Sequence, residues 1–388
     1  MLTAEQLEIR AMAREFSRGE IRPHVEDWDT ERALPEEIFQ KLAELGFLGM
    51  RVPEAHGGLA LDATTYLTAL EALAWGDASV ALSLSIHNGP VTRALLGWGT
   101  EAQQERWLPP LAAGEFLAAF ALSERDAGSD PSSLAAEARP SGDGWILDGT
   151  KAWVTNGDRA GLLLVFARTG ESRDGISAFL VPRETPGIEV VGRDRTLGLS
   201  ASETVTLGLS EVFLPREAML GAPGEGFEIA MDALTIGRLG IAAQSLGIAQ
   251  AAFEHALDYS GEREQFGHSL HRFGGIEEKL AGMAIRIAQA RALTLEVAAF
   301  VDGDGGPSEE LPSSLRARTA MAKVAASEAA MWTADEAVQI YGGYGYMRDY
   351  PVERLMRDAK GTEIYEGANE VLRMLVARHT VRESAGAE

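Results

Sequence analysis

Residues 339–373 read QIYGGYGYMRDYPVERLMRDAKGTEIYEGANEVLR, and this stretch carries more information than any other part of the chain. It holds a Gly-Gly-Tyr-Gly-Tyr turn, five Arg or Lys residues and a Tyr-Glu-Gly sequence. One Gly is enough to cap a helix, so the pair Gly342-Gly343 indicates a close approach of a ligand to the backbone. Glu366 is flanked by an aromatic residue and a glycine. The stretch therefore predicts a site where a large anionic ligand meets one acid/base residue.

The bulk composition narrows the class of protein. The chain has 388 residues, of which 46% are hydrophobic, enough for two or three domains with cores of their own. Its net charge of −23 comes without a basic run, so we expect neither nucleic acid nor an anionic membrane surface as a partner. The absence of cysteine excludes disulfides, thiolate metal sites and a Cys nucleophile.

The N-terminus has no signal-peptide pattern, and no run of eighteen apolar residues occurs. We therefore expect a cytoplasmic protein without membrane insertion.

The pattern of apolar and turn residues changes twice along the chain. Up to about residue 115 the apolar spacing is helical, with helices predicted over 35–45, 63–75 and 100–113. From about 116 to 225, short apolar runs alternate with turn residues, which predicts strands at 161–168, 176–181 and 204–209.

Long helices return after residue 226. A three-four apolar spacing persists over 276–300, and an Ala-rich helix without Gly or Pro is predicted over 313–341. We therefore predict an α+β multidomain chain with an N-terminal helical domain (1–115), a middle domain built on an antiparallel sheet or small barrel (116–225) and a C-terminal helical bundle (226–388).

Several common catalytic signatures are missing. The Gly-x-Gly sequences at 343–345 and 224–226 lack the third glycine of a dinucleotide-binding turn, and both lie in helical blocks. No phosphate loop and no Gly-x-Ser-x-Gly elbow is present. The seven histidines are scattered, and only His268 and His271 are close in sequence, so we predict no metal site.

Two other segments offer ligand-binding chemistry. LSERDAGSDPSS (122–133) is rich in hydroxyls and small residues, which suits an oxygen-rich ligand, although a solvated hairpin has the same composition. In GTKAWVTNG (149–157), Trp153 and Thr155 lie two residues apart on a strand and share a face. They suit stacking on and hydrogen bonding to a heteroaromatic ring, whereas the alternative is a core Trp beside a strand-forming Thr.

These motifs together resemble one family. The segments SERDAGSD, GTKAWVTNG, REQFG, VQIYGGYGY, YPVERLMRDAK and IYEG occur in the order typical of acyl-CoA dehydrogenases, over essentially the whole chain. The resemblance implies an N-terminal helical domain, a central antiparallel β-barrel-like domain and a C-terminal four-helix bundle that usually builds a homotetramer. It also implies non-covalent FAD, an acyl-CoA substrate oxidised to its trans-2-enoyl form, and electron transfer flavoprotein as the electron acceptor.

The resemblance assigns roles to individual residues. Glu366 matches the catalytic base that removes the α-proton, while the β-hydrogen leaves as hydride to flavin N5. Ser129, Arg238 and Gly367 match substrate-binding positions. Positions matching cofactor contacts are Phe120, Leu122, Ser123, Ser129, Trp153, Thr155, Arg263, Gln265, Phe266, Gln339, Gly342, Gly343, Ala368, Asn369 and Glu370. Among them Arg263, Gln265, Gln339 and Gly343 would serve the FAD of a neighbouring subunit.

Some family members carry the base on the preceding helix, just before an Arg. That position is Gly237 here, so no second carboxylate competes with Glu366. The alternatives are an acyl-CoA oxidase or a flavin monooxygenase on the same scaffold, and a non-catalytic assembly protein that retains the scaffold. Intact flavin and base motifs count against the last of these.

Overall fold

The computed structural model describes residues 2–172, 175–303 and 312–385. Its N-terminal part is helical, as predicted. The helices are α1 (Ala4–Phe16), α2 (Val25–Glu31), α3 (Glu36–Glu44), α4 (Ala63–Gly76), α5 (Ala78–Ile86), α6 (Thr92–Trp98) and α7 (Glu101–Ala112). Helices α4 and α5 are buried on nearly every face, and Asp77 separates them by accepting hydrogen bonds from the first amides of α5.

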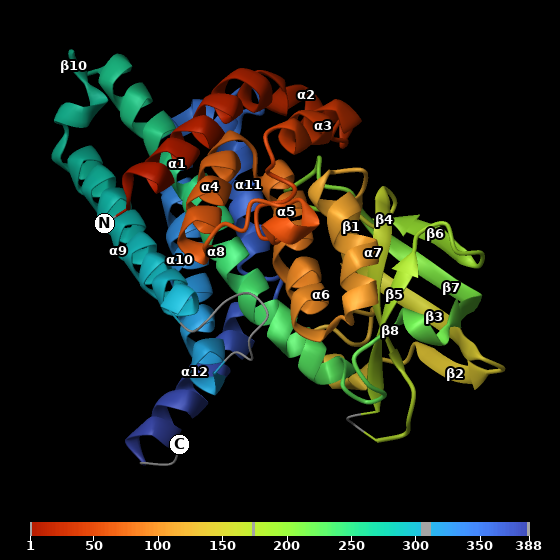
Figure 1. The fold of residues 1–388 in the computed structure, drawn as a ribbon. Coiled ribbons are helices and arrows are strands. Elements are labelled where there is room, and N and C mark those ends of the chain that lie inside the picture. Colours follow the sequence, from red (N-terminus) through yellow and green to blue (C-terminus); the bar gives the residue numbers. More distant parts are fainter. Residues whose placement is uncertain (1, 173–174, 304–311, 386–388) are drawn as a thin grey trace.

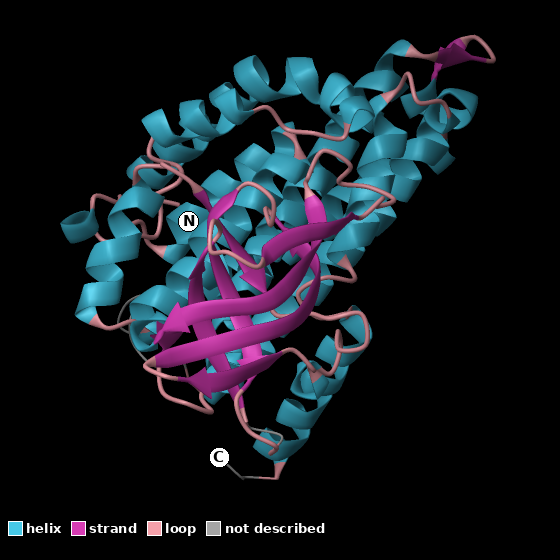
Figure 2. Cartoon of the chain, turned by 90° about the vertical axis from the view of Figure 1, so that its right-hand side faces the viewer, coloured by secondary structure: helices cyan, strands magenta, loops and turns pink. Residues whose placement is uncertain are grey.

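A twisted sheet follows (Figure 2). Its strands are β1 (Leu117–Ala121), β2 (Glu137–Ser141), β3 (Gly144–Thr155), β4 (Ala160–Arg168), β5 (Ile176–Pro182), β6 (Ile188–Arg193), β7 (Thr204–Pro215) and β8 (Met219–Leu220). The order along the sheet is β6-β7-β3-β2-β4-β5-β8, with β1 on β4. Most neighbours are antiparallel, as predicted. The pairings of β1 and of β2 with β4 are parallel instead.

Long helices form the C-terminal part: α8 (Gly226–Glu262), α9 (Gly274–Gly303), α10 (Ser313–Tyr341), α11 (Pro351–Thr362) and α12 (Asn369–Ser384). Helix α10 packs on α8, α9 and α11, and α8 also packs on α9 and α11, which gives the four-helix arrangement. Helix α12 packs against α10. A small hairpin of β9 (Glu264–Gln265) and β10 (His268–Ser269) lies between α8 and α9.

Helix α8 connects the parts of the molecule. It packs against α4, α5 and α6 on one side and against α10 on another, and its N-terminal region meets β5. In Figure 1 the N-terminal helices lie between the sheet and the long C-terminal helices. Helix α8 therefore contacts elements from all three parts of the sequence. In the described part of the chain, every helix is too short or too polar to span a bilayer.

Candidate active site

Glu366 lies in the turn between α11 and α12, with a left-handed backbone (φ 51°). Both of its carboxylate oxygens are buried and have no hydrogen-bond partner among the described residues. Burial raises the pKa of Glu366 to about 8, although the positive charges of Arg238 and Lys323 act in the opposite direction. A buried acceptor without a donor is rare in folded proteins and marks a place where a ligand supplies the missing contact.

The Glu366 carboxylate rests on the backbone of α8 at Gly237. A Cβ atom built on Gly237 would lie 2.2 Å from Glu366 Oε2, far inside van der Waals contact. Only glycine leaves room there for the carboxylate. The position just before Arg238 on α8 is therefore occupied in space by the side chain of Glu366.

Two buried cations hold the turn that carries Glu366. Lys323, on α10, is fully buried and donates to the Gly367 carbonyl and to Asn369 Oδ1, both at 2.9 Å. Arg238 Nε donates to the Glu366 carbonyl at 3.4 Å. Burial lowers the pKa of Lys323 to about 8 and that of Arg238 to about 10. Their contacts fix the left-handed pair Glu366-Gly367, in which Gly367 has φ 101°.

Trp153 and Thr155 stand near the end of β3. A register shift between Lys151 and Val154 turns the strand, and Trp153 takes a positive φ of 56° within it. Trp153 is 49% exposed, Val154 is buried and Thr155 is half-buried, so Trp153 and Thr155 share a face as predicted. The alternative that Trp153 belongs to the core is wrong, since the bulge directs its ring outward.

The loop that begins at Leu122 is anchored by a buried ion pair that the sequence analysis missed. Lys151, fully buried on β3, donates to Glu124 Oε1 at 2.6 Å and to the Leu122 carbonyl at 3.2 Å. Glu124 also accepts from the amides of Ala135 and Ala136. The start of this loop is therefore held to the sheet, unlike a solvated hairpin, although Ser129 further along is exposed.

Ser123 is hydrogen-bonded to β3 through its backbone. The Ala152 amide donates to the Ser123 carbonyl at 2.9 Å, so Ser123 and Trp153 are brought to one edge of the sheet. Phe120 lies half-buried on β1 with its ring 5.0 Å from that of Phe166, and Leu122 is buried.

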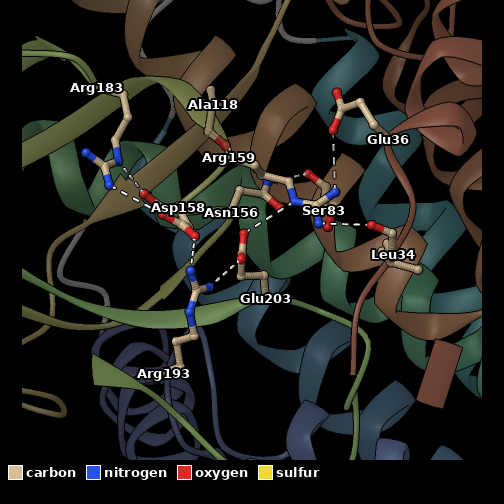
Figure 3. A network of polar contacts seen from close by, with 11 residues as sticks. Leu34, Glu36, Ser83, Ala118, Asn156, Asp158, Arg159, Arg183, Arg193 and Glu203 are labelled. Carbon is tan, nitrogen blue, oxygen red and sulfur yellow. Dashed lines mark hydrogen bonds and ion pairs between the residues drawn. The ribbon is translucent and has the colours of Figure 1, made fainter. Parts of the chain in front are cut away.

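The turn after β3 ties this edge to the helices. Figure 3 shows Asn156 between Ser83 and Ala118, whose carbonyls accept from its amide at 3.2 and 3.1 Å. Nearby, Arg159 donates to the Leu34 carbonyl at 3.0 Å and to Glu203 Oε2 at 3.3 Å. Thr155 is thereby fixed relative to α5 and β1.

A second group of predicted cofactor residues lies elsewhere. Arg263, Gln265 and Phe266 are exposed at the β9–β10 hairpin, and Gln339, Gly342 and Gly343 are exposed at the end of α10. The Arg263 guanidinium lies 5.6 Å from the ring of Tyr344, which joins the two segments. Figure 1 places the hairpin at the far end of the long helices, away from the sheet. This group therefore lies on a different part of the molecule from the sheet that carries Trp153.

The remaining predicted residues lie at the start of α12. Ala368 is half-buried at the N-cap, Glu370 is exposed, and Asn369 is buried with its amide directed to Ser327 Oγ at 3.0 Å. The side chain of Asn369 is thus bonded within the chain. Lys323, its other partner, was not singled out from the sequence, where its only signal is a lone Lys within an Ala-rich helix.

Comparison with known proteins finds one family along nearly the whole chain. Family models for the acyl-CoA dehydrogenase N-terminal, middle and C-terminal domains match residues 3–115, 119–212 and 224–381. An acyl-CoA dehydrogenase of Bacillus subtilis is 42% identical over 97% of this chain and 98% of its own length. The mitochondrial short-chain specific acyl-CoA dehydrogenase of Rattus norvegicus is 42% identical over 96% of this chain and 89% of its own.

Two solved structures share the fold closely. Butyryl-CoA dehydrogenase from Megasphaera elsdenii has a TM-score of 0.94 at 39% identity and covers 98% of this chain and 99% of its own. A chain in a structure described as the electron transferring flavoprotein of Acidaminococcus fermentans gives the same values. The chain belongs to the acyl-CoA dehydrogenase family.

Proposed function

We propose that this flavoprotein oxidises an acyl-CoA thioester to the trans-2-enoyl-CoA, with Glu366 as the base that removes the α-proton. One observation carries the proposal: the Glu366 carboxylate is buried, lacks a hydrogen-bond partner among the described residues and has a pKa raised to about 8. A carboxylate in that condition is a stronger base than one in water. The family to which the chain belongs contains acyl-CoA dehydrogenases.

The residues around Glu366 hold it in position for proton removal. Gly237 forms the surface against which the carboxylate lies. Lys323 and Arg238 hold the turn through the carbonyls of Gly367 and Glu366. The backbone N–H of Glu366 sits on the same turn, and we assign it to the thioester oxygen, where negative charge develops as the proton leaves.

FAD is the cofactor of this family, and the residues present fit it. Trp153 offers an exposed ring face beside Thr155, while Ser123 lies at the same sheet edge. A Cβ atom built on Gly342 or on Gly343 would meet no other atom within 4 Å, so the bare backbone there leaves room for a ligand. When bound, FAD accepts the hydrogen and electrons that leave the β-carbon.

The separation of the two cofactor groups supports a homo-oligomer. Within one chain the hairpin of Arg263, Gln265 and Phe266 lies at the far end of the long helices, away from the sheet that carries Trp153 (Figure 1). We assign the hairpin, together with Gln339, Gly342 and Gly343, to the adenosine side of a neighbouring subunit's FAD. The assembly proposed is a homotetramer, in which Phe266, 91% exposed in the single chain, would be covered.

The names of the relatives bear on substrate and partner. Two of them are a short-chain specific acyl-CoA dehydrogenase and a butyryl-CoA dehydrogenase, so we assign a short-chain acyl-CoA as the substrate. The likeness to a chain described with the electron transferring flavoprotein of Acidaminococcus fermentans supports such a flavoprotein as the electron acceptor.

The sequence-based domain limits, 1–115, 116–225 and 226–388, are the division that we propose. Helix α7 ends at Ala112, β1 begins at Leu117 and α8 begins at Gly226, which places both limits between elements.

Mixing the purified, FAD-loaded protein with butyryl-CoA without oxygen tests the proposal. Loss of the visible flavin absorbance together with formation of crotonyl-CoA is the expected result. Reduced protein should then pass its electrons to electron transfer flavoprotein much faster than to oxygen. Rapid peroxide formation in air would identify an oxidase instead, and a flavin that no acyl-CoA reduces would overturn the assignment as a dehydrogenase.

A further inference from the structure

Two buried hydroxyls on different helices lie close to the site and have no assigned role. Tyr66, on α4, is 1% exposed, and Ser85, on α5, is fully buried. Neither hydroxyl makes a well-formed hydrogen bond with any described residue, although the Ser85 hydroxyl is near enough to lower the pKa of Tyr66 against the larger effect of burial. An unsatisfied buried hydroxyl is costly, and such groups occur where a ligand or a bound water completes them.

Both hydroxyls pack against α8 at Gly240. A Cβ atom built on Gly240 would lie 2.2 Å from Ser85 Oγ and 3.4 Å from the Tyr66 hydroxyl. Gly240 comes one helical turn after Gly237, whose Cβ position would meet Glu366 Oε2. The two glycines therefore lie on one face of α8, with the carboxylate of Glu366 at one and the hydroxyl pair at the other.

A third glycine, Gly89, lies close both to Gly237 and to the Tyr66 hydroxyl. A Cβ atom on Gly89 would lie 3.7 Å from the Tyr66 hydroxyl and 3.8 Å from the Cα atom of Gly237. The charge of Glu366 is close enough to Tyr66 to contribute to raising the pKa of that phenol. The Glu366 carboxylate, the three glycines and the hydroxyl pair thus form one contiguous cluster, built from α4, α8, α5 with the segment after it, and the turn before α12.

We propose that Tyr66 and Ser85 determine the acyl-chain length: they form the polar end of the acyl-binding surface and restrict it to short acyl groups. The inference rests on the proposed function, because Glu366 must lie at the α-carbon of the substrate. From there the tail extends along α8 in the direction of the hydroxyls. A four-carbon tail stops before them and leaves a water to satisfy both. A longer aliphatic tail displaces that water and leaves two hydroxyls against methylene groups.

The test compares substrates of different length on the FAD-loaded protein and on three variants, Tyr66→Phe, Ser85→Ala and the double variant. For each, kcat/KM is measured with butyryl-, hexanoyl- and octanoyl-CoA. The wild type should favour butyryl-CoA. In the double variant the ratio of octanoyl- to butyryl-CoA kcat/KM should rise by about tenfold or more, since the unsatisfied hydroxyls that penalised the longer tail are gone.

Binding gives a second readout that does not depend on turnover. Calorimetric Kd values for trans-2-octenoyl-CoA and crotonyl-CoA should converge in the double variant by a similar factor. Ser245→Ala is the matched control, because it also removes a buried hydroxyl from this region, one that bonds to the Ile241 carbonyl of its own helix. It should leave both ratios unchanged.

The outcomes separate the inference from the proposed function. Turnover of butyryl-CoA with unaltered length ratios in a folded, FAD-loaded double variant would overturn the role of Tyr66 and Ser85 alone. A wild type that prefers octanoyl-CoA would overturn it as well. Failure of every acyl-CoA to reduce the wild-type flavin would instead remove the proposed function.

Discussion

The carboxylate of Glu366, in the turn between α11 and α12, lies directly against the backbone of Gly237, in the N-terminal third of α8. A single methyl group on Gly237 would fall 2.2 Å from Glu366 Oε2. The contact explains why a glycine precedes Arg238 here, because the side chain of Glu366 fills the space that a larger residue would need.

Gly237→Ala should therefore damage catalysis without unfolding the protein. The new methyl group displaces the Glu366 carboxylate, and a shift of about 1 Å costs roughly a hundredfold in kcat. FAD content and the far-ultraviolet circular dichroism spectrum should remain those of the wild type.

Gly261→Ala is the control on the same helix, since its Cβ would meet nothing nearer than 3.7 Å. Alanine is the better helix former, so this variant should keep full activity and stability. Wild-type turnover in Gly237→Ala would contradict the placement of the base.

The raised pKa of Glu366 predicts how stability depends on pH. In the unfolded chain this carboxyl titrates near its ordinary value of 4.5, and in the fold near 8. Between these values only the folded state holds the proton, so the contribution of Glu366 to stability falls as pH rises from about 4.5 to 8 and then levels off.

Glu366→Gln removes the loss of stability that ionisation of Glu366 causes at high pH. The Tm of the FAD-loaded variant should exceed that of the wild type by roughly 5 °C at pH 9, with little difference at pH 5. A gain of equal size at both pH values would show that Glu366 titrates normally in the fold.

Lys323 should influence both the pKa and the position of Glu366, the base that we propose. Lys323→Met keeps the length of the side chain but removes the charge and both hydrogen bonds to Gly367 and Asn369. Because the Lys323 charge lowers the pKa of Glu366, its loss should move the kinetic pKa in the pH profile of kcat upward. The loosened turn should also reduce kcat by about tenfold or more.

Lys41→Met provides the comparison for Lys323→Met, since Lys41 is an exposed residue paired with Glu20 on the surface. Its pH profile should match that of the wild type. An unshifted profile and unchanged kcat in Lys323→Met would exclude a positioning role for Lys323.

Much of the fold was predictable because its periodicity is local. The Ala-rich helix predicted over 313–341 is α10 (Ser313–Tyr341), and the strand predicted over 161–168 lies within β4. The parallel pairing of β1 with β4 was not predicted, since pairing partners depend on long-range contacts that no local pattern specifies.

The residues of the candidate site also fall into those that could be predicted from the sequence and those that could not. Glu366 and the Trp153–Thr155 pair could be named from their neighbours in sequence. Lys323, Lys151 and the hydroxyls of Tyr66 and Ser85 could not, because their importance comes from burial beside groups far away in the chain. The Arg-rich stretch within 339–373, which contributed to the prediction of an anionic ligand, is partly structural: Arg357 pairs with Asp29 at 2.8 Å and with Glu353 at 2.7 Å.

The most direct test of the central claim is a single-turnover experiment on Glu366→Gln. Wild-type and variant proteins, both loaded with FAD, are mixed without oxygen with excess butyryl-CoA, and the flavin absorbance is followed by stopped flow. The flavin of the wild type should be reduced, and lose its absorbance, during the stopped-flow measurement. The variant should bind butyryl-CoA but keep the oxidised flavin spectrum, because its rate of flavin reduction is lower by about a thousandfold or more. Bleaching of the variant at the wild-type rate would show that another residue removes the α-proton.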